Sequence, residues 1–153
     1  MPTQENFISC KHFDQLSTRE LYSILQLRIE VFCVEQECPY LDTDGKDLEC
    51  WHLLIQNSEK KLIAYSRLIP KGISYPEYVS IGRVVCAEGS RKKGLGKLLM
   101  EKSMENVKIL FGDTPIKIGA QAYLIRFYES LGFISTGENY LEDGIPHVKM
   151  IRN

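Results

Sequence analysis

The chain has 153 residues, of which 44% are hydrophobic and 25% are charged, and its formal net charge is −1. This length predicts a single domain, 1–153, with enough core to fold without disulfide or metal staples. The balanced charge argues against a general nucleic-acid binder. No apolar run approaches the roughly 20 residues of a membrane span, and residues 1–13 lack a signal-peptide layout. Five cysteines without a CxxC pair fit free thiols and a cytoplasmic location.

The first half of the chain predicts one helix and four strands. Residues 7–13 favour a strand, and Ser17 with Glu20 forms a capping box that begins a helix. Apolar residues follow helical spacing as far as Phe32, and Arg28 lies within that stripe. Residues 33–49 predict a loop or irregular helix. Residues 51–56 and 62–69 predict a hairpin, and residues 78–86 predict a further strand.

The second half predicts two helices and three strands. Residues 95–111 have helical spacing, residues 116–119 favour a strand, and residues 124–131 predict a helix that ends at Gly132. Residues 133–136 and 147–151 predict two last strands, joined through residues 137–146. The order β-α-β-β-β-α-β-α-β-β predicts an α/β layered domain with a mixed sheet.

A basic, glycine-bearing turn between a strand and a helix is the most informative segment. It comprises Arg91, Lys92, Lys93, Gly94, Leu95, Gly96 and Lys97. A helix start offers unpaired N–H groups and a positive dipole end to an anion, and glycines let the backbone approach it closely. The turn therefore predicts a phosphate or pyrophosphate site. The alternative is a solvated charge run that opens an ordinary helix.

Two familiar phosphate motifs do not fit this turn. The Walker pattern fails because Arg91 stands at its first glycine and Leu98 follows Lys97, and the dinucleotide pattern fails because Leu99 occupies its third glycine. The remaining pattern, Arg-x-x-Gly-x-Gly after a buried strand, resembles the signature (Gln/Arg)-x-x-Gly-x-(Gly/Ala) of the GNAT superfamily of N-acetyltransferases. In that family the signature binds the pyrophosphate of coenzyme A.

The resemblance extends over residues 5–151. Residues 127–133 resemble the family segment Tyr-x-x-x-Gly-Phe, and residues 27–32, 34–36 and 142–147 resemble the ElaA-type branch. The resemblance implies a GNAT-like layered domain whose mixed, mostly antiparallel central sheet has about six or seven strands flanked by helices. It also implies direct transfer of an acetyl group from acetyl-CoA, as co-substrate, to a primary amine, with no metal.

The resemblance assigns roles to several residues. A main-chain N–H among Val84, Val85 and Cys86 would polarise the thioester carbonyl, and Tyr128 would protonate the departing thiolate. Gln121 stands where the family often has Asn, beside the pantetheine arm. Cys86 is expected to be a small buried side chain and not a nucleophile. Tyr128 also falls on an apolar stripe, so a purely structural role stays open.

The acceptor side is less defined. Glu35, His52 and His147 are the candidate general bases, and Arg28, Glu35 and His147 are the candidate substrate-binding residues. Arg28 could instead be a scaffold arginine paired with a carboxylate. Residues 35–49 hold six carboxylates and one lysine, which favours a cationic acceptor, unless this segment is merely solvated and remote.

Other functions and partners follow from the same residues. Cys33, Cys38, Cys50 and His52 could be drawn as zinc ligands, but their spacing disfavours a structural site, so no metal is expected. The competing function is a non-catalytic CoA-binding regulatory or interaction module. The expected partner is a small-molecule or peptide amine acceptor, with a homodimer left open and with no nucleic acid and no membrane.

Overall fold

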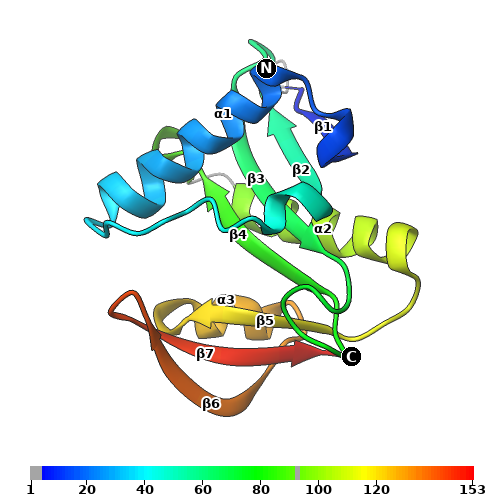
Figure 1. Cartoon of the computed structure of the whole chain (residues 1–153), viewed down its shortest axis with the longest axis vertical. Helices are drawn as coiled ribbons and strands as arrows, with labels where there is room; N and C mark the ends of the chain where they lie inside the picture. Colours follow the sequence, from blue (N-terminus) through cyan, green and yellow to red (C-terminus); the bar gives the residue numbers. More distant parts are fainter. Residues whose placement is uncertain (1–4, 92–93) are drawn as a thin grey trace.

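The structure, a computed structural model, describes residues 5–91 and 94–153 and places their strands in two sheets (Figure 1). One sheet has four strands in the order β1-β2-β3-β4, and the other has three in the order β5-β7-β6; neighbours within each sheet are antiparallel. The first sheet comprises β1 (Phe7–His12), β2 (Trp51–Gln56), β3 (Leu62–Ile69) and β4 (Ser80–Cys86). The second comprises β5 (Ile116–Gln121), β6 (Ile134–Glu142) and β7 (Ile145–Arg152).

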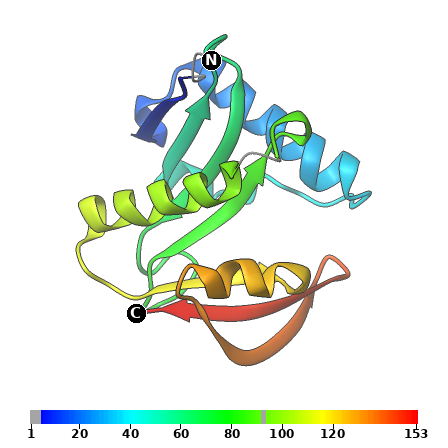
Figure 2. The same cartoon turned by 180° about the vertical axis from the view of Figure 1, so that it is seen from behind.

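Helices cover both sides of this arrangement. Helix α1 (Thr18–Arg28) lies on one side, while α2 (Leu95–Phe111) and α3 (Ile125–Ser130) lie on the other, as Figure 2 shows. Ser17 and Glu20 cap α1 as expected, because the Ser17 hydroxyl accepts from the Glu20 amide and the Glu20 carboxylate accepts from the Ser17 amide. A π-helical stretch, Ile29–Glu35, continues α1. No helix in the described ranges is long and apolar enough to cross a membrane.

Strands β4 and β5 run parallel and then diverge (Figure 1). They are joined at Val79 and Ile116, where the Lys117 amide donates to the Val79 carbonyl at 3.0 Å. Beyond that bridge, each strand pairs only with its own sheet. The carboxyl ends of β4 and β5 therefore belong to different sheets. We call the place where these two strands separate the opening, and it positions the site described below.

The core consists of clusters of buried side chains between the two sheets and the helices that cover them. The largest cluster joins β5 and β7 to α2 and α3, and it includes Met100, Tyr128 and Phe133. Strand β3 is buried along its entire length, because α1 covers one face of the first sheet and α2 covers the other.

The element order is as predicted, and the bounds of β2, β3 and α2 agree with the expected ranges. The prediction that residues 137–146 form a connection was wrong. Strand β6 continues to Glu142, and only Asp143 and Gly144 turn the chain into β7. Almost every residue of β6 is exposed. The strand is therefore held in place by its pairing with β7 and not by an alternating apolar face.

Candidate active site

The backbone of β4 is distorted beside the opening. The register between β3 and β4 shifts between Tyr65 and Arg67, and Arg83 has a φ of +50°. Such a bulge re-aims the residues that follow it and is common next to active sites. These residues are Val84, Val85 and Cys86. They lie in β4, the edge strand of the first sheet, beyond the point where β5 contacts it. That one of their N–H groups faces a thioester stays a prediction.

The turn that follows β4 leads directly into α2. Gly94 is the N-cap residue, with no side-chain cap, and the first turn of α2 contains no acidic residue. The start of this 17-residue helix therefore has the polarity and the N–H groups that suit an anion. Lys92 and Lys93, predicted to contribute to the same site, lie outside the described residues.

The two glycines of the turn serve different purposes. Gly94 has a φ of +71°, a left-handed conformation that favours glycine, and a Cβ there would meet nothing within 4 Å. A Cβ on Gly96 would lie 3.7 Å from the Phe127 ring, which is ordinary contact. Gly94 is thus required by backbone conformation, whereas the Gly96 position also has room for alanine.

Arg91 is paired with the π-helical stretch after α1. Its Nη1 and Nη2 donate to the two Glu35 carboxylate oxygens at 2.7 and 2.6 Å, and its Nε donates to the Cys86 carbonyl at 3.2 Å. The hydrogen bonds from Arg91 lower the pKa of Glu35. Both side chains are partly exposed, at 38% and 32%, so a ligand phosphate can compete for Arg91. Lys97 is 70% exposed and its ammonium lies 3.9 Å from Glu101.

Tyr128 lies on α3 and belongs to the main core cluster. Its ring packs edge-on against Phe127 and Phe133. Burial raises the pKa of its phenol, with smaller contributions from neighbouring Tyr123 and Cys86, so the hydroxyl stays protonated at neutral pH. Within the described residues, the Tyr128 hydroxyl forms no hydrogen bond. It is also not among the fully buried polar atoms that lack a partner. The protonated phenol thus lies near Cys86, at the end of β4.

Cys86 does not have the character of a nucleophile. Burial raises the pKa of its thiol to about 11, although Arg91 acts in the opposite direction. The thiol is therefore protonated at neutral pH, and a thiol reacts poorly compared with a thiolate.

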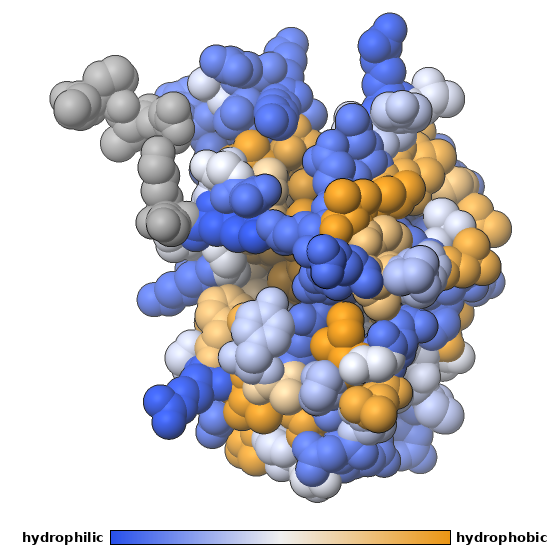
Figure 3. Space-filling view, turned by 90° about the vertical axis from the view of Figure 1, so that its left-hand side faces the viewer, coloured by the Kyte–Doolittle hydropathy of each residue, from blue (hydrophilic) through white to orange (hydrophobic). Residues whose placement is uncertain are grey.

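Gln121, at the end of β5, contacts a segment that crosses the opening. Its side-chain amide exchanges long hydrogen bonds of 3.4 and 3.5 Å with Gln36. In the same segment as Gln36, the Cys38 thiol donates to the Asp143 carbonyl in the β6–β7 turn at 3.5 Å. Figure 3 looks onto this end of the molecule, where hydrophilic and hydrophobic side chains are interspersed.

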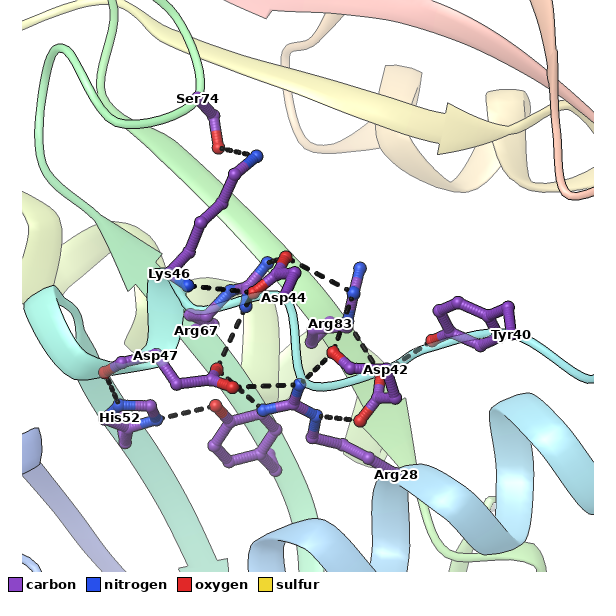
Figure 4. Close-up of polar contacts among 11 residues, drawn as sticks. Arg28, Tyr40, Asp42, Asp44, Lys46, Asp47, His52, Arg67, Ser74 and Arg83 are labelled. Carbon is purple, nitrogen blue, oxygen red and sulfur yellow. Dashed lines mark hydrogen bonds and ion pairs between the residues drawn. The ribbon is translucent and has the colours of Figure 1, made fainter.

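Six charged side chains form an arginine–aspartate cluster on the α1 side of β3 and β4 (Figure 4). They are Arg28, Asp42, Asp44, Asp47, Arg67 and Arg83. Arg28 donates to Asp42 and Asp47 at 2.7 and 2.8 Å. Arg67 donates to Asp44 and Asp47, both at 2.9 Å. Three positive charges meet three negative charges, so the cluster is formally neutral.

This cluster corrects two expectations. Arg28 is 0% exposed, so it offers no surface to a substrate and is a scaffold arginine. Asp42, Asp44 and Asp47 are not free carboxylates of a cation-attracting segment, because three arginines neutralise them. Asp42 and Asp47 are buried, and Asp44 is partly exposed. Arg67 and Arg83 were missed by the sequence analysis, although each stands in a strand with buried neighbours and therefore needs a carboxylate partner.

The two histidines have different surroundings. His52 is 0% exposed, and its ring nitrogens contact the Tyr65 hydroxyl at 2.7 Å and the Asp47 carbonyl at 3.0 Å. Burial lowers its pKa. Because both nitrogens are engaged inside the protein, His52 is excluded as the general base. His147 lies opposite Gln121 in β7, with its Nε2 3.4 Å from the Glu142 carboxylate.

The cysteines are free, and no disulfide links them. Over residues 5–91 and 94–153, no three His, Cys, Asp or Glu side chains gather in a way that could hold a metal ion.

Residues 31–153 match the acetyltransferase (GNAT) domain, and the chain belongs to this family. It is an acyl-CoA-dependent acyltransferase of the N-acetyltransferase type.

Relatives and solved structures agree with this assignment. The chain is 46% identical to Protein ElaA of Escherichia coli over 143 residues, which is 92% of each chain. A crystal structure of E. coli ElaA matches 97% of this chain and 100% of that chain, with a TM-score of 0.90 and 42% identity. An acyl-CoA N-acyltransferase from Pseudomonas aeruginosa matches 96% of this chain and 99% of that one, with a TM-score of 0.88 and 44% identity. The ElaA-type resemblance is therefore confirmed.

Proposed function

We propose that the protein transfers the acetyl group of acetyl-CoA directly to a primary amine. The observation that carries this proposal is the meeting of two features at one opening. A helix start without an acidic residue follows β4, and the protonated Tyr128 lies beside the end of the same strand. The first feature suits the phosphates of CoA, and the second suits its thiol end.

The cofactor-binding part would comprise the end of β4 and the turn. Val84, Val85 and Cys86 would offer a main-chain donor to the thioester carbonyl, and Gln121 would contact the pantetheine arm after releasing Gln36. The pyrophosphate would accept hydrogen bonds from the N–H groups at Leu95, Gly96 and Lys97. Arg91 would exchange Glu35 for the phosphate.

These groups account for the bonds that form and break in the transfer and for its protons. The neutral amine nitrogen attacks the thioester carbon, the carbon–sulfur bond breaks, and the amine loses one proton to a base. The departing thiolate takes the Tyr128 proton, which solvent then replaces. No acyl-enzyme forms, in agreement with the protonated state of Cys86. Glu35 and His147 remain the acceptor-side candidates, and a single domain, 1–153, would hold the whole site.

Two measurements test this proposal. Free thiol release from acetyl-CoA, screened over amines, should identify an acceptor, whereas CoA binding without turnover of any amine would favour the regulatory module. Calorimetry should show a severe loss of CoA affinity in Gly96→Val, because a branched side chain intrudes on the phosphate. Gly96→Ala is the matched control, since its Cβ fits against Phe127. Unchanged affinity in a folded Gly96→Val variant would remove the turn from the site.

A further inference from the structure

The face of the second sheet that lies away from α3 carries an unusual set of side chains. In β5, Ile118 and Ala120 are buried in the core against the helices. Because side chains alternate along a strand, Lys117, Gly119 and Gln121 lie on the opposite face. This face borders the same opening as the proposed site, on the side where residues 36–38 cross it.

Strand register adds a second lysine to this face. Gly119 pairs with Lys149, and Gln121 pairs with His147. Lys149 is thus a diagonal cross-strand neighbour of the predicted pantetheine contact Gln121, at about 7–8 Å. We define the lysine–tyrosine patch as Tyr75, Tyr78, Lys117, Tyr140 and Lys149.

The tyrosine rings hold the two ammonium groups in place. The Lys149 ammonium lies 4.9 Å from the centre of the Tyr75 ring and 4.3 Å from that of Tyr140, and it donates to the Tyr75 hydroxyl at 3.1 Å. The Lys117 ammonium lies 5.0 Å from the Tyr75 ring and 5.5 Å from the Tyr78 ring. Ring faces attract cations without neutralising them. Gly119 leaves the space for the Tyr140 hydroxyl, with which a Cβ would collide.

The patch has an uncompensated positive charge. Among the ion pairs of the described residues, none includes Lys117 or Lys149. The carboxylate of Glu142, in the adjoining hairpin, lies instead 3.4 Å from the Nε2 atom of His147. Burial alone lowers the pKa of Lys149, but the Tyr75 hydrogen bond and the neighbouring phenols raise it overall, so the lysine stays charged. Burial raises the pKa of Tyr140, which stays neutral.

The phosphates of CoA do not account for this charge. The basic turn follows the carboxyl end of β4, where the two sheets are apart. Lys117 instead adjoins the bridge between Val79 and Ile116, where the sheets are joined. Half-buried cations without a counter-ion favour an anionic ligand. In the proposed function, the ligand besides CoA is the acceptor.

We propose that the lysine–tyrosine patch binds a carboxylate of the acceptor, so that the acceptor is an amino acid or a short peptide and not a polycation. This inference rests on the proposed function. It replaces the expectation of a cationic acceptor, because Asp42, Asp44 and Asp47 of the segment 35–49 are paired within the arginine–aspartate cluster. Lys149 is the principal contact, and Lys117 strengthens it.

Thiol release with paired acceptors tests the inference. Each amino acid is compared with its carboxamide, and a tripeptide with a free C-terminus is compared with its amidated form. We expect the free acids to be preferred about tenfold or more in kcat/KM, the scale of one charge-assisted hydrogen bond. Lys149→Met should abolish the preference through KM, Lys149→Arg should retain it, and Lys117→Met should reduce it. Lys108→Met, at an exposed position on α2, is the matched control and should change nothing.

Several outcomes would overturn the inference. Equal or better use of carboxamides and polyamines by the unchanged protein is one. Another is a preference for acids that survives in a folded Lys117→Met, Lys149→Met double variant, with folding checked by thermal unfolding. A panel in which no free acid is acetylated also overturns it, and calorimetry with CoA then shows separately whether the proposed function fails. Intact CoA binding together with turnover of other amines would retain the enzyme and reject only its acceptor class.

Discussion

Strand β4 lies between two charged regions that use their charges differently. On its α1 side, the arginine–aspartate cluster pairs every carboxylate with a guanidinium inside the protein. At its carboxyl end, the turn into α2 has cations and helix N–H groups, and the pair between Arg91 and Glu35 is partly exposed. Local charge density in the sequence is high in both regions, but only the second has charge that a ligand can reach.

Energetics should separate the two regions in the same way. Removing one partner of a buried pair leaves an uncompensated charge and costs about 3–5 kcal/mol, whereas an exposed pair contributes about 0–1 kcal/mol. The cluster should therefore govern stability with little direct effect on ligand affinity. The turn should do the opposite.

The largest expected effect on stability comes from Arg28→Met. Arg28 is 0% exposed and contacts both Asp42 and Asp47, so the variant leaves two carboxylates without their main partner. The free energy of unfolding, measured with urea, should fall by about 3–5 kcal/mol. Lys108→Met is the control and should change it by less than about 0.5 kcal/mol. A fall below about 1 kcal/mol for Arg28→Met would mean that the cluster is not held as described.

The turn should respond in affinity instead. Arg91→Gln should weaken CoA binding about tenfold, because one charge-assisted hydrogen bond is lost, while stability hardly changes. Glu35→Gln should strengthen CoA binding, since Arg91 no longer has a competing carboxylate. Calorimetry measures both. If the two variants change CoA affinity in the same direction, Glu35 and the phosphate do not compete for Arg91.

Acid provides a smaller and more graded test of the cluster. Burial raises the pKa of Asp44, but its pairs with Arg67 and the other neighbours lower it overall to about 2. The folded-state pKa is below the unfolded value near 3.9, so this carboxylate stabilises the fold above about pH 4 and loses its effect as pH falls towards 2. The unfolding free energy should therefore decline over that window, and Asp44→Asn should flatten the decline. An identical slope in the variant would contradict the pairing.

Much of the fold is predictable from local patterns. Strands β2 and β3 and helix α2 have uninterrupted apolar patterns with clear turn residues at their ends, and their bounds agree with the structure. Strand β6 could not be found in this way, because an exposed strand is held by backbone pairing with β7 and has no apolar face. Gly137, which has a φ of +82° in the structure, is a residue type typical of turns and therefore favoured the prediction of a loop.

The sites divide similarly. The turn from Arg91 to Lys97 is contiguous, so sequence reasoning could recognise it. The partners of Asp44 and Asp47 are Arg67 and Arg28, which are 19 to 23 residues away, and no spacing rule links them. Tyr75 and Lys149 are 74 residues apart and meet only through strand register. Groups that come together in this way require the fold.

The central claim is that this opening performs acyl transfer, and Tyr128→Phe tests it most directly. The variant keeps the ring in the core and removes only the proton donor. With an acceptor from the amine screen, turnover should fall about 10²- to 10⁴-fold, the scale of acid catalysis, while calorimetric CoA affinity and the melting temperature stay unchanged. Turnover near that of the unchanged protein would contradict the account and leave Tyr128 with a purely structural role.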